Sequence, residues 1–166
     1  MTRIAVETDV FVVGGGPSGL AVAIAARNRG FSVTVTDIAR PPIDKACGEG
    51  IMPDGLAALR QLGVKIPLDA AVPFQGIRFL DDESAVQARF AQGSGLGLRR
   101  TKLHEVLIAK AAEAGIDMHW GAHVTGLTPD GVAVNGINVR CRWVVGADGQ
   151  NSRVRCWSGL ESVRSA

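Results

Sequence analysis

A glycine motif near the amino terminus constrains the fold more than any other feature of this sequence. Gly14, Gly16 and Gly19 give the spacing G-x-G-x-x-G, with residues 9–13 before the motif and Pro17 inside it. The run before the motif is β-branched and aromatic, which is typical of a strand buried in a parallel sheet. Proline is well accepted in a first helical turn. The pattern therefore predicts a strand, a tight turn and a helix.

The chain after the motif completes a β-α-β unit. The apolar series at residues 20–25 predicts a helix, which Gly30 is expected to end. Residues 31–36 show the alternating pattern of a second strand. Asp37 follows this run, 18 residues after Gly19. That spacing matches an acid that accepts hydrogen bonds from ribose hydroxyls.

The predicted turn has the properties of a pyrophosphate-binding site. Gly14 permits the tight turn, Gly16 lets phosphates approach the backbone, and Gly19 lets the helix pack closely on the strand. The helix N-terminus, which includes Ser18, supplies unpaired N–H groups and positive dipole potential. A glycine-rich turn without a ligand is the alternative. The unit does not separate NAD from FAD, since both contain an ADP half.

Composition favours one compact domain. A chain of 166 residues is large enough for one core and short for two. Charged residues make up 20% and the net charge is +2, which argues against disorder and against a polyanion-binding surface. The three cysteines form no C-x-x-C pair, so we expect a reducing, cytoplasmic setting. Residues 10–26 are uncharged, but the glycines and Pro17 interrupt them, so no membrane segment is expected.

A second cluster of small and charged residues lies near the carboxyl terminus. Residues 143–147 predict another buried strand, and residues 148–155 fit the pattern D-G-x-x-S-x-x-R. Together with the glycine motif, this segment resembles the FAD-dependent oxidoreductases of the p-hydroxybenzoate hydroxylase class. That superfamily includes aromatic hydroxylases, flavin halogenases and geranylgeranyl reductases. The resemblance implies an α/β, Rossmann-like three-layer FAD-binding fold, with a parallel sheet plus small antiparallel hairpins or a meander.

Other segments carry the same resemblance. Arg40 is similar to the arginine of the family's acid-x-x-Arg segment, and residues 45–55 resemble a flavin-side loop of the geranylgeranyl-reductase-like branch. Arg100 is similar to a family arginine that contacts FAD, and Val124 to a position beside the adenine. The resemblance implies that the cofactor-binding residues are Gly14, Gly16, Pro17, Ser18, Gly19, Asp37, Ile38, Arg40, Cys47, Gly48, Gly50, Arg100, Val124, Asp148, Gly149, Ser152 and Arg155.

Two departures from the family pattern bear on function. Asp37 stands where these flavoproteins often carry Glu, although the shorter side chain still reaches a ribose. The family's Gly-Asp flavin motif and its substrate domain would lie beyond Ala166. We therefore interpret residues 1–166 as the amino-terminal part of an FAD-binding domain, truncated, with residues 161–166 as a frayed end.

Several residues admit a second interpretation. Cys47 is interpreted as a structural thiol near the cofactor rather than a redox thiol, since the loop holds no second cysteine. His119 and His123 are four residues apart, but strand-like context and an intervening glycine place them poorly for a metal, so no metal site is expected.

Several acidic and basic side chains also admit more than one interpretation. Glu49 is either a catalytic acid or a helix cap. Asp148 is better interpreted as a carboxylate bound to loop amides and ribityl hydroxyls than as a base, because the flavin supplies the chemistry in this class. Arg153 and Arg155 fit phosphate or carboxylate pairing better than nucleic-acid binding.

The remaining pattern predicts the rest of the elements. We expect a helix ending at Gly63, a helix over 101–114, a third parallel strand over 116–120, and hairpins pairing 76–80 with 85–90 and 132–134 with 137–140.

The predicted function is that of the FAD-binding portion of a flavin-dependent, NAD(P)H-using oxidoreductase. The reaction would be hydroxylation of a small organic substrate or reduction of a prenyl-type one, with catalytic residues unassigned. The alternative is a non-catalytic dinucleotide-binding fragment or a subunit completed by a second chain or by another copy. Half of an NAD dehydrogenase is a third reading, which leaves residues 148–155 unexplained.

Overall fold

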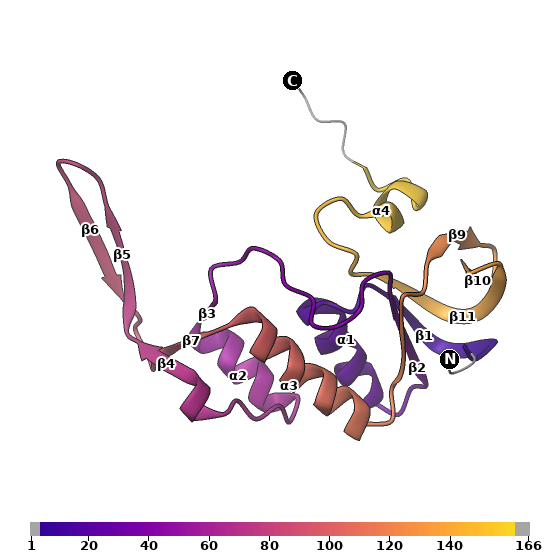
Figure 1. Ribbon diagram of the computed structural model, residues 1–166, viewed down its shortest axis with the longest axis horizontal. Helices are drawn as coiled ribbons and strands as arrows, with labels where there is room; N and C mark the ends of the chain where they lie inside the picture. Colours follow the sequence, from indigo (N-terminus) through magenta and orange to yellow (C-terminus); the bar gives the residue numbers. More distant parts are fainter. Residues whose placement is uncertain (1–3, 162–166) are drawn as a thin grey trace.

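Residues 4–161 of the computed structural model are built around a six-stranded sheet with the strand order β8-β2-β1-β11-β10-β9 (Figure 1). Of the predicted frayed end at 161–166, residues 162–166 lie outside the described residues. The helices are α1 Pro17–Arg27, α2 Pro53–Gln61, α3 Arg100–Glu113 and α4 Arg153–Trp157, with a short 3-10 turn at Leu68–Ala70. The strands of the main sheet are β1 Glu7–Val13, β2 Val33–Asp37, β8 Asp117–Trp120, β9 Val124–Thr128, β10 Gly131–Val134 and β11 Ile137–Gly146.

Strand β1 lies in the middle of the parallel part of the sheet. It pairs in parallel with β2 on one side and with the second half of β11 on the other, and β8 extends the parallel array beyond β2. Strands β9 and β10 join as an antiparallel meander. The predicted parallel-dominant α/β fold with added antiparallel strands is therefore confirmed.

The two faces of β1 enter two separate apolar cores. Val10 and Val12 pack with Leu20 and Ile24 of α1 and with Leu107 of α3 on one face. Phe11 and Val13 belong to the second core, which also contains apolar residues of the meander and Val154 of α4. Alternate residues of a strand point to opposite faces, so one short strand anchors helices on one face and the meander with α4 on the other.

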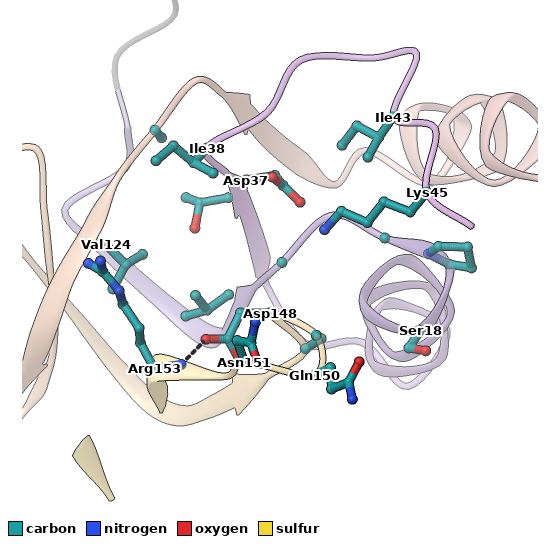
Figure 2. Close-up of a pocket in the computed structure, with 18 of the residues that line it drawn as sticks. Ser18, Asp37, Ile38, Ile43, Lys45, Val124, Asp148, Gln150, Asn151 and Arg153 are labelled. Atoms are coloured by element: carbon teal, nitrogen blue, oxygen red, sulfur yellow. Dashed lines mark hydrogen bonds between the residues drawn. The ribbon is translucent and has the colours of Figure 1, made fainter. Parts of the chain in front are cut away.

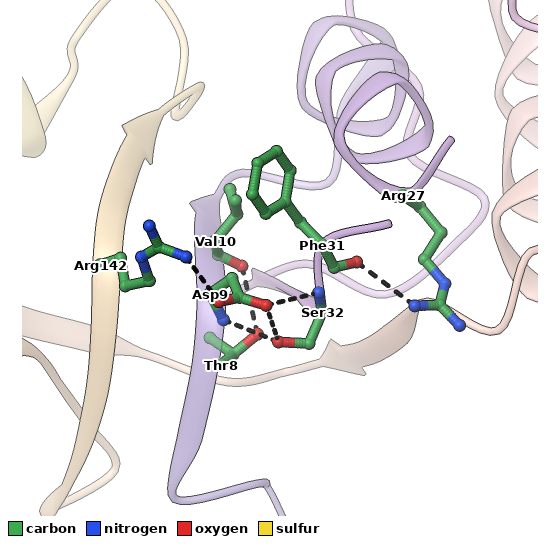
Figure 3. A network of polar contacts seen from close by, with 7 residues as sticks. All are labelled: Thr8, Asp9, Val10, Arg27, Phe31, Ser32 and Arg142. Carbon is green, nitrogen blue, oxygen red and sulfur yellow. Dashed lines mark hydrogen bonds and ion pairs between the residues drawn. The ribbon is translucent and has the colours of Figure 1, made fainter. Parts of the chain in front are cut away.

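A polar network fixes the start of β1 relative to its neighbours (Figure 3). The Asp9 carboxylate accepts hydrogen bonds from the Ser32 N–H at 2.9 Å and the Ser32 hydroxyl at 2.7 Å, and the Asp9 N–H donates back to that hydroxyl oxygen. Arg142 of β11 pairs with the same carboxylate at 3.5 Å. The network joins three neighbouring strands at the end opposite to the glycine motif.

The long strand β11 corrects one prediction. The segments predicted as a hairpin strand at 137–140 and a buried strand at 143–147 form one continuous strand, because its first half pairs with β10 and its second half with β1. Trp143 is 45% exposed and none of residues 143–147 is buried, so the prediction of a buried strand was wrong for this segment. Its ring packs edge-on against Phe31, at 5.3 Å between centroids, and the Arg142 guanidinium lies 4.3 Å from its centre.

The other predicted elements are confirmed with small shifts at their ends. Strands β5 Gly76–Leu80 and β6 Ala85–Arg89 form a separate two-stranded hairpin that projects from the body (Figure 1). Strands β3 Gly50–Ile51, β4 Ala71–Phe74 and β7 Gly95–Leu98 form a small antiparallel sheet. Asn135 and Gly136 both have positive φ, at 47° and 79°, as the predicted primed turn requires.

Candidate nucleotide-binding site

A cleft of about 740 Å³ opens beside the carboxyl ends of β1, β2 and β11 (Figure 2). In open parallel sheets, ligands bind at this edge. The cleft gathers ten of the predicted cofactor-binding residues, which are Gly14, Gly16, Pro17, Ser18, Asp37, Ile38, Arg100, Val124, Asp148 and Gly149. Segments more than 100 residues apart in the sequence thus line one cavity.

The glycine turn is shaped by close backbone approach. Gly14 has a φ of 110°, and a Cβ at this position would overlap with the carbonyl of Ala147 at the end of β11. A Cβ on Gly19 would overlap with the carbonyl oxygen of Gly14. Gly19 does not line the cleft. Because it has no side chain, it lets α1 approach the strand closely, as predicted. The two turns touch because β1 and β11 are neighbours.

Asp37 lies at the end of β2, where the sequence predicts it. One carboxylate oxygen accepts the Gly15 N–H and the other accepts the Ala39 N–H, each at 2.8 Å. A carboxylate oxygen has two lone pairs, so both oxygens can still accept hydrogen bonds from the cleft. Asp37 therefore holds the glycine turn and also offers acceptors to a ribose.

Two buried polar atoms in the described residues have no hydrogen-bond partner, and both belong to residues that line this cleft. They are the Thr36 hydroxyl oxygen and the Arg100 Nε. Buried polar atoms are almost always paired, so an unpaired one calls for a specific explanation. An Arg100 terminal nitrogen lies 3.8 Å from the position that a Cβ of Gly16 would occupy. The unpaired atoms and the adjacent backbone fit a polar, anionic ligand lying along the glycine turn.

The second turn is organised by its own carboxylate. Asp148 accepts hydrogen bonds from the Ser152 hydroxyl, from the Arg153 N–H at 2.7 Å and from the Val154 N–H at 3.2 Å. Burial alone would raise the pKa of Asp148, but these hydrogen bonds outweigh it, so the pKa lies below its usual value. The carboxylate is bound to loop amides, as predicted, and it stabilises the start of α4.

The predicted site residues outside the cleft have other surroundings. They are Gly19, Arg40, Cys47, Gly48, Gly50, Ser152 and Arg155. Ser152 caps α4 by accepting the Arg155 N–H at 3.0 Å, and the Arg155 guanidinium donates to the carbonyl of Gln150. Arg40 lies against Gly121, and Cys47 is an exposed free thiol. Their predicted contacts with a cofactor stay predictions.

The structure gives the alternative interpretations concrete surroundings. Glu49 accepts a hydrogen bond from the Arg100 N–H at 3.1 Å, which places it as a cap at the start of α3. His119 lies 2.7 Å from the Asp117 carboxylate. Residues 4–161 contain no cluster of three side chains suited to a metal ion.

Sequence reasoning missed about half of the cleft. The additional lining residues are Val13, Thr36, Ile43, Lys45, Ala46, Ala122, His123, Ala147, Gln150, Asn151, Arg153 and Trp157. Figure 2 shows Lys45 extending from the loop after β2 toward the cleft, across from Asn151 and Arg153 of the second turn. Five of them lie within two segments that the sequence analysis singles out: Lys45 and Ala46 in 45–55, and Gln150, Asn151 and Arg153 in 148–155. Arg153 is also interpreted there as suited to phosphate or carboxylate pairing. None of the helices in the part of the chain that the structure describes has the length and apolarity needed to cross a membrane.

A glycine turn, a strand-end acid and a helix N-terminus at the carboxyl edge of a parallel sheet define the site of a dinucleotide-binding protein. Residues 7–165 match the family model described as FAD binding domain, and the chain belongs to this family.

Known proteins resemble the chain in sequence and in fold. The chain is 34% identical over 157 residues to a menaquinone reductase of Mycolicibacterium smegmatis, covering 88% of this chain and 38% of that protein. It is 33% identical over 177 residues to digeranylgeranylglycerophospholipid reductase 2 of Methanosphaera stadtmanae, covering 94% and 43%. A solved structure of a variant of PqsL from P. aeruginosa superposes with a TM-score of 0.83 at 21% identity, covering 96% of this chain and 48% of that one. The chain thus spans about two fifths of the length of these two curated relatives.

Proposed function

We propose that this chain binds FAD in the cleft and serves as the nucleotide-binding part of an NAD(P)H-using reductase of a prenyl-type substrate. The observation that carries the proposal is that both unpaired buried polar atoms, Thr36 Oγ1 and Arg100 Nε, belong to residues that line the same cleft as the glycine turn. Reduction is favoured over hydroxylation because two of the relatives are named as reductases, one of menaquinone and one of digeranylgeranylglycerophospholipid.

The residues of the cleft divide the dinucleotide between them. The backbone of Gly14 and Gly16, the N-terminus of α1 and the Arg100 guanidinium would bind the pyrophosphate. Asp37 would accept the ribose hydroxyls, and Val124 would lie beside the adenine. When bound, the flavin ring of FAD supplies hydride acceptance and transfer.

Charge in the cleft agrees with an anionic ligand. The chain carries a net charge of only +2, so attraction for two phosphates has to be local. Lys45, Arg100 and Arg153 all line the cleft, and the N-terminus of α1 adds positive potential to it. Among residues 4–161, the acidic residues lining the cleft are Asp37 and Asp148, and both already accept hydrogen bonds from backbone N–H groups.

Replacement of Thr36 by valine tests the proposal. Without ligand, Thr36→Val removes a buried unpaired hydroxyl and is expected to raise the melting temperature. With ligand, it removes a hydrogen-bond partner, so the Kd for FAD is expected to rise by about threefold to tenfold. Thr34→Val is the matched control, because Thr34 is equally buried on the same strand but lies outside the cleft. Titration of flavin fluorescence measures the Kd of both variants, and thermal denaturation without ligand measures their melting temperatures. An unchanged Kd in Thr36→Val would contradict the proposal.

A second candidate function is a nucleotide-binding module without turnover. It is favoured by one observation: every role assigned above to a residue of the cleft is a binding role. Addition of NADPH or NADH to the FAD-loaded protein under anaerobic conditions distinguishes the two candidate functions. Bleaching of the flavin absorbance supports the reductase, and FAD binding without bleaching supports the module.

A further inference from the structure

The glycine turn contains three successive glycines, and the middle one is contacted by side chains of three other elements. Residues 14–16 are Gly-Gly-Gly, which in an unfolded chain is the most flexible of tripeptides. An anion-binding turn built this way gains affinity only if other contacts fix it before the ligand arrives. Gly15 occupies one of the three variable positions of the G-x-G-x-x-G motif, so the motif itself gives it no role.

Three side chains from three different elements surround Gly15. Its N–H donates to Asp37 of β2 at 2.8 Å. Its carbonyl oxygen lies 2.7 Å from Nε2 of His104 in α3. A Cβ on Gly15 would overlap with the ring of Trp120 at the end of β8. The N–H, the carbonyl and the Cα of this residue thus each contact a distant part of the chain.

His104 is a buried histidine with a defined task. It is 1% exposed, and its ring packs edge-on against Trp120 with 5.9 Å between centroids. A carbonyl oxygen only accepts hydrogen bonds, so Nε2 of His104 must carry the proton in this contact. The surroundings therefore select the Nε2–H form of the ring.

The hydrogen bond to the Gly15 carbonyl also orients the next amide. The peptide unit is planar and trans, so the N–H of Gly16 points opposite to the carbonyl of Gly15. Because that carbonyl is directed at α3, the Gly16 N–H is directed away from α3, and Gly16 lines the cleft. Arg100 lies one helical turn before His104, on the same face of α3, and its guanidinium approaches Gly16.

We propose that His104 is a positioning residue for dinucleotide binding: it fixes the Gly15–Gly16 peptide, so that α3 holds the turn with His104 while Arg100 binds the ligand. The inference rests on the proposed function for the choice of ligand. The His104 contact itself is independent of that choice.

The test compares leucine and glutamine at position 104. His104→Leu removes the donor and is expected to raise the Kd for FAD about tenfold. His104→Gln places an amide N–H at a similar reach and is expected to restore affinity to within about threefold of the original. His119→Leu is the matched control, because His119 is also buried but bonds to Asp117 and does not line the cleft. Equal affinities of the leucine variant and the unchanged protein would overturn the proposal, and so would a glutamine variant as weak as the leucine one.

A ligand-free measurement separates this inference from the proposed function. Amide hydrogen exchange at Gly15, whose N–H donates to Asp37, is expected to speed up about tenfold in His104→Leu and to stay unchanged in His119→Leu. Nitrogen NMR of the unchanged protein should show a protonated Nε2 at His104. If FAD does not bind but both results hold, the proposed function fails and the positioning role stands. A protonated Nδ1 with a bare Nε2 would contradict the positioning role.

Discussion

The two turns that flank the cleft are stabilised in opposite ways. The turn at 14–19 is held from outside, by Asp37, His104 and Trp120 on three other elements, together with close contact to Ala147. The turn at 148–153 is held from within, since Asp148 accepts hydrogen bonds from residues four to six positions further along the chain.

This difference predicts how far the effect of a substitution extends through the molecule. The glycine turn depends on residues distant in sequence, so changes far from the cleft should alter its affinity. The Asp148 turn is a local capping motif, so its disruption should stay confined to α4 and its neighbours. The predictions below test this contrast.

The largest effect is expected for Gly15→Ala. The added Cβ would overlap with the Trp120 ring, so either β8 or the turn must shift, at a cost of about 3 kcal/mol or more. FAD binding should become undetectable, and the melting temperature should fall. Gly126→Ala is the control, because a Cβ there meets nothing within 4 Å. Thermal denaturation of both variants with and without FAD measures the effect, and a stable, FAD-binding Gly15→Ala protein would show that the turn is free to move.

A smaller effect is expected for Asp148→Ala. The change leaves the N–H groups of Arg153 and Val154 without their acceptor, which costs about 1 to 2 kcal/mol in the free energy of unfolding. Hydrogen exchange should increase at 149–157 and remain unchanged at 14–19. Increased exchange in both turns would contradict the contrast between them.

Ser152→Ala should lower the free energy of unfolding by about 1 kcal/mol, which is less than Asp148→Ala, because it removes only the cap on the Arg155 N–H and one donor to Asp148. Ser158→Ala is the control: its hydroxyl donates to an exposed carbonyl at the other end of α4. Urea denaturation of the two variants gives the comparison. Equal stabilities would show that the cap contributes nothing.

The smallest effect is a pH dependence. The folded protein lowers the pKa of Asp148 below the usual 3.8, so its contribution to stability is complete above that pH and is lost as the pH falls through the lower, folded value. In Asp148→Asn this part of the acid dependence should disappear. Melting temperatures between pH 5 and pH 2 give the comparison, and identical acid profiles would argue against an ionised capping carboxylate.

The parts of this molecule that were predictable are those encoded locally. The G-x-G-x-x-G spacing predicted the turn and α1, and Asn135-Gly136 predicted the second hairpin, because each depends on backbone conformations that few residues adopt. Asp37 was predicted by its spacing, and the structure adds that it also holds Gly15.

What escaped prediction depends on contacts made at a distance. The approach of His104 and Trp120 to Gly15 joins positions about 90 or more residues apart, and no local pattern encodes it. The continuity of β11 depends on its having different partners along its two halves. Lys45 escaped because the loop that carries it has no regular element to fix its direction.

Amide hydrogen exchange during an FAD titration tests the proposal that both turns bind one FAD molecule. We expect protection at 14–19 and at 148–153, rising together with a single Kd. Protection of one turn alone, or of the two turns at clearly different FAD concentrations, would contradict it.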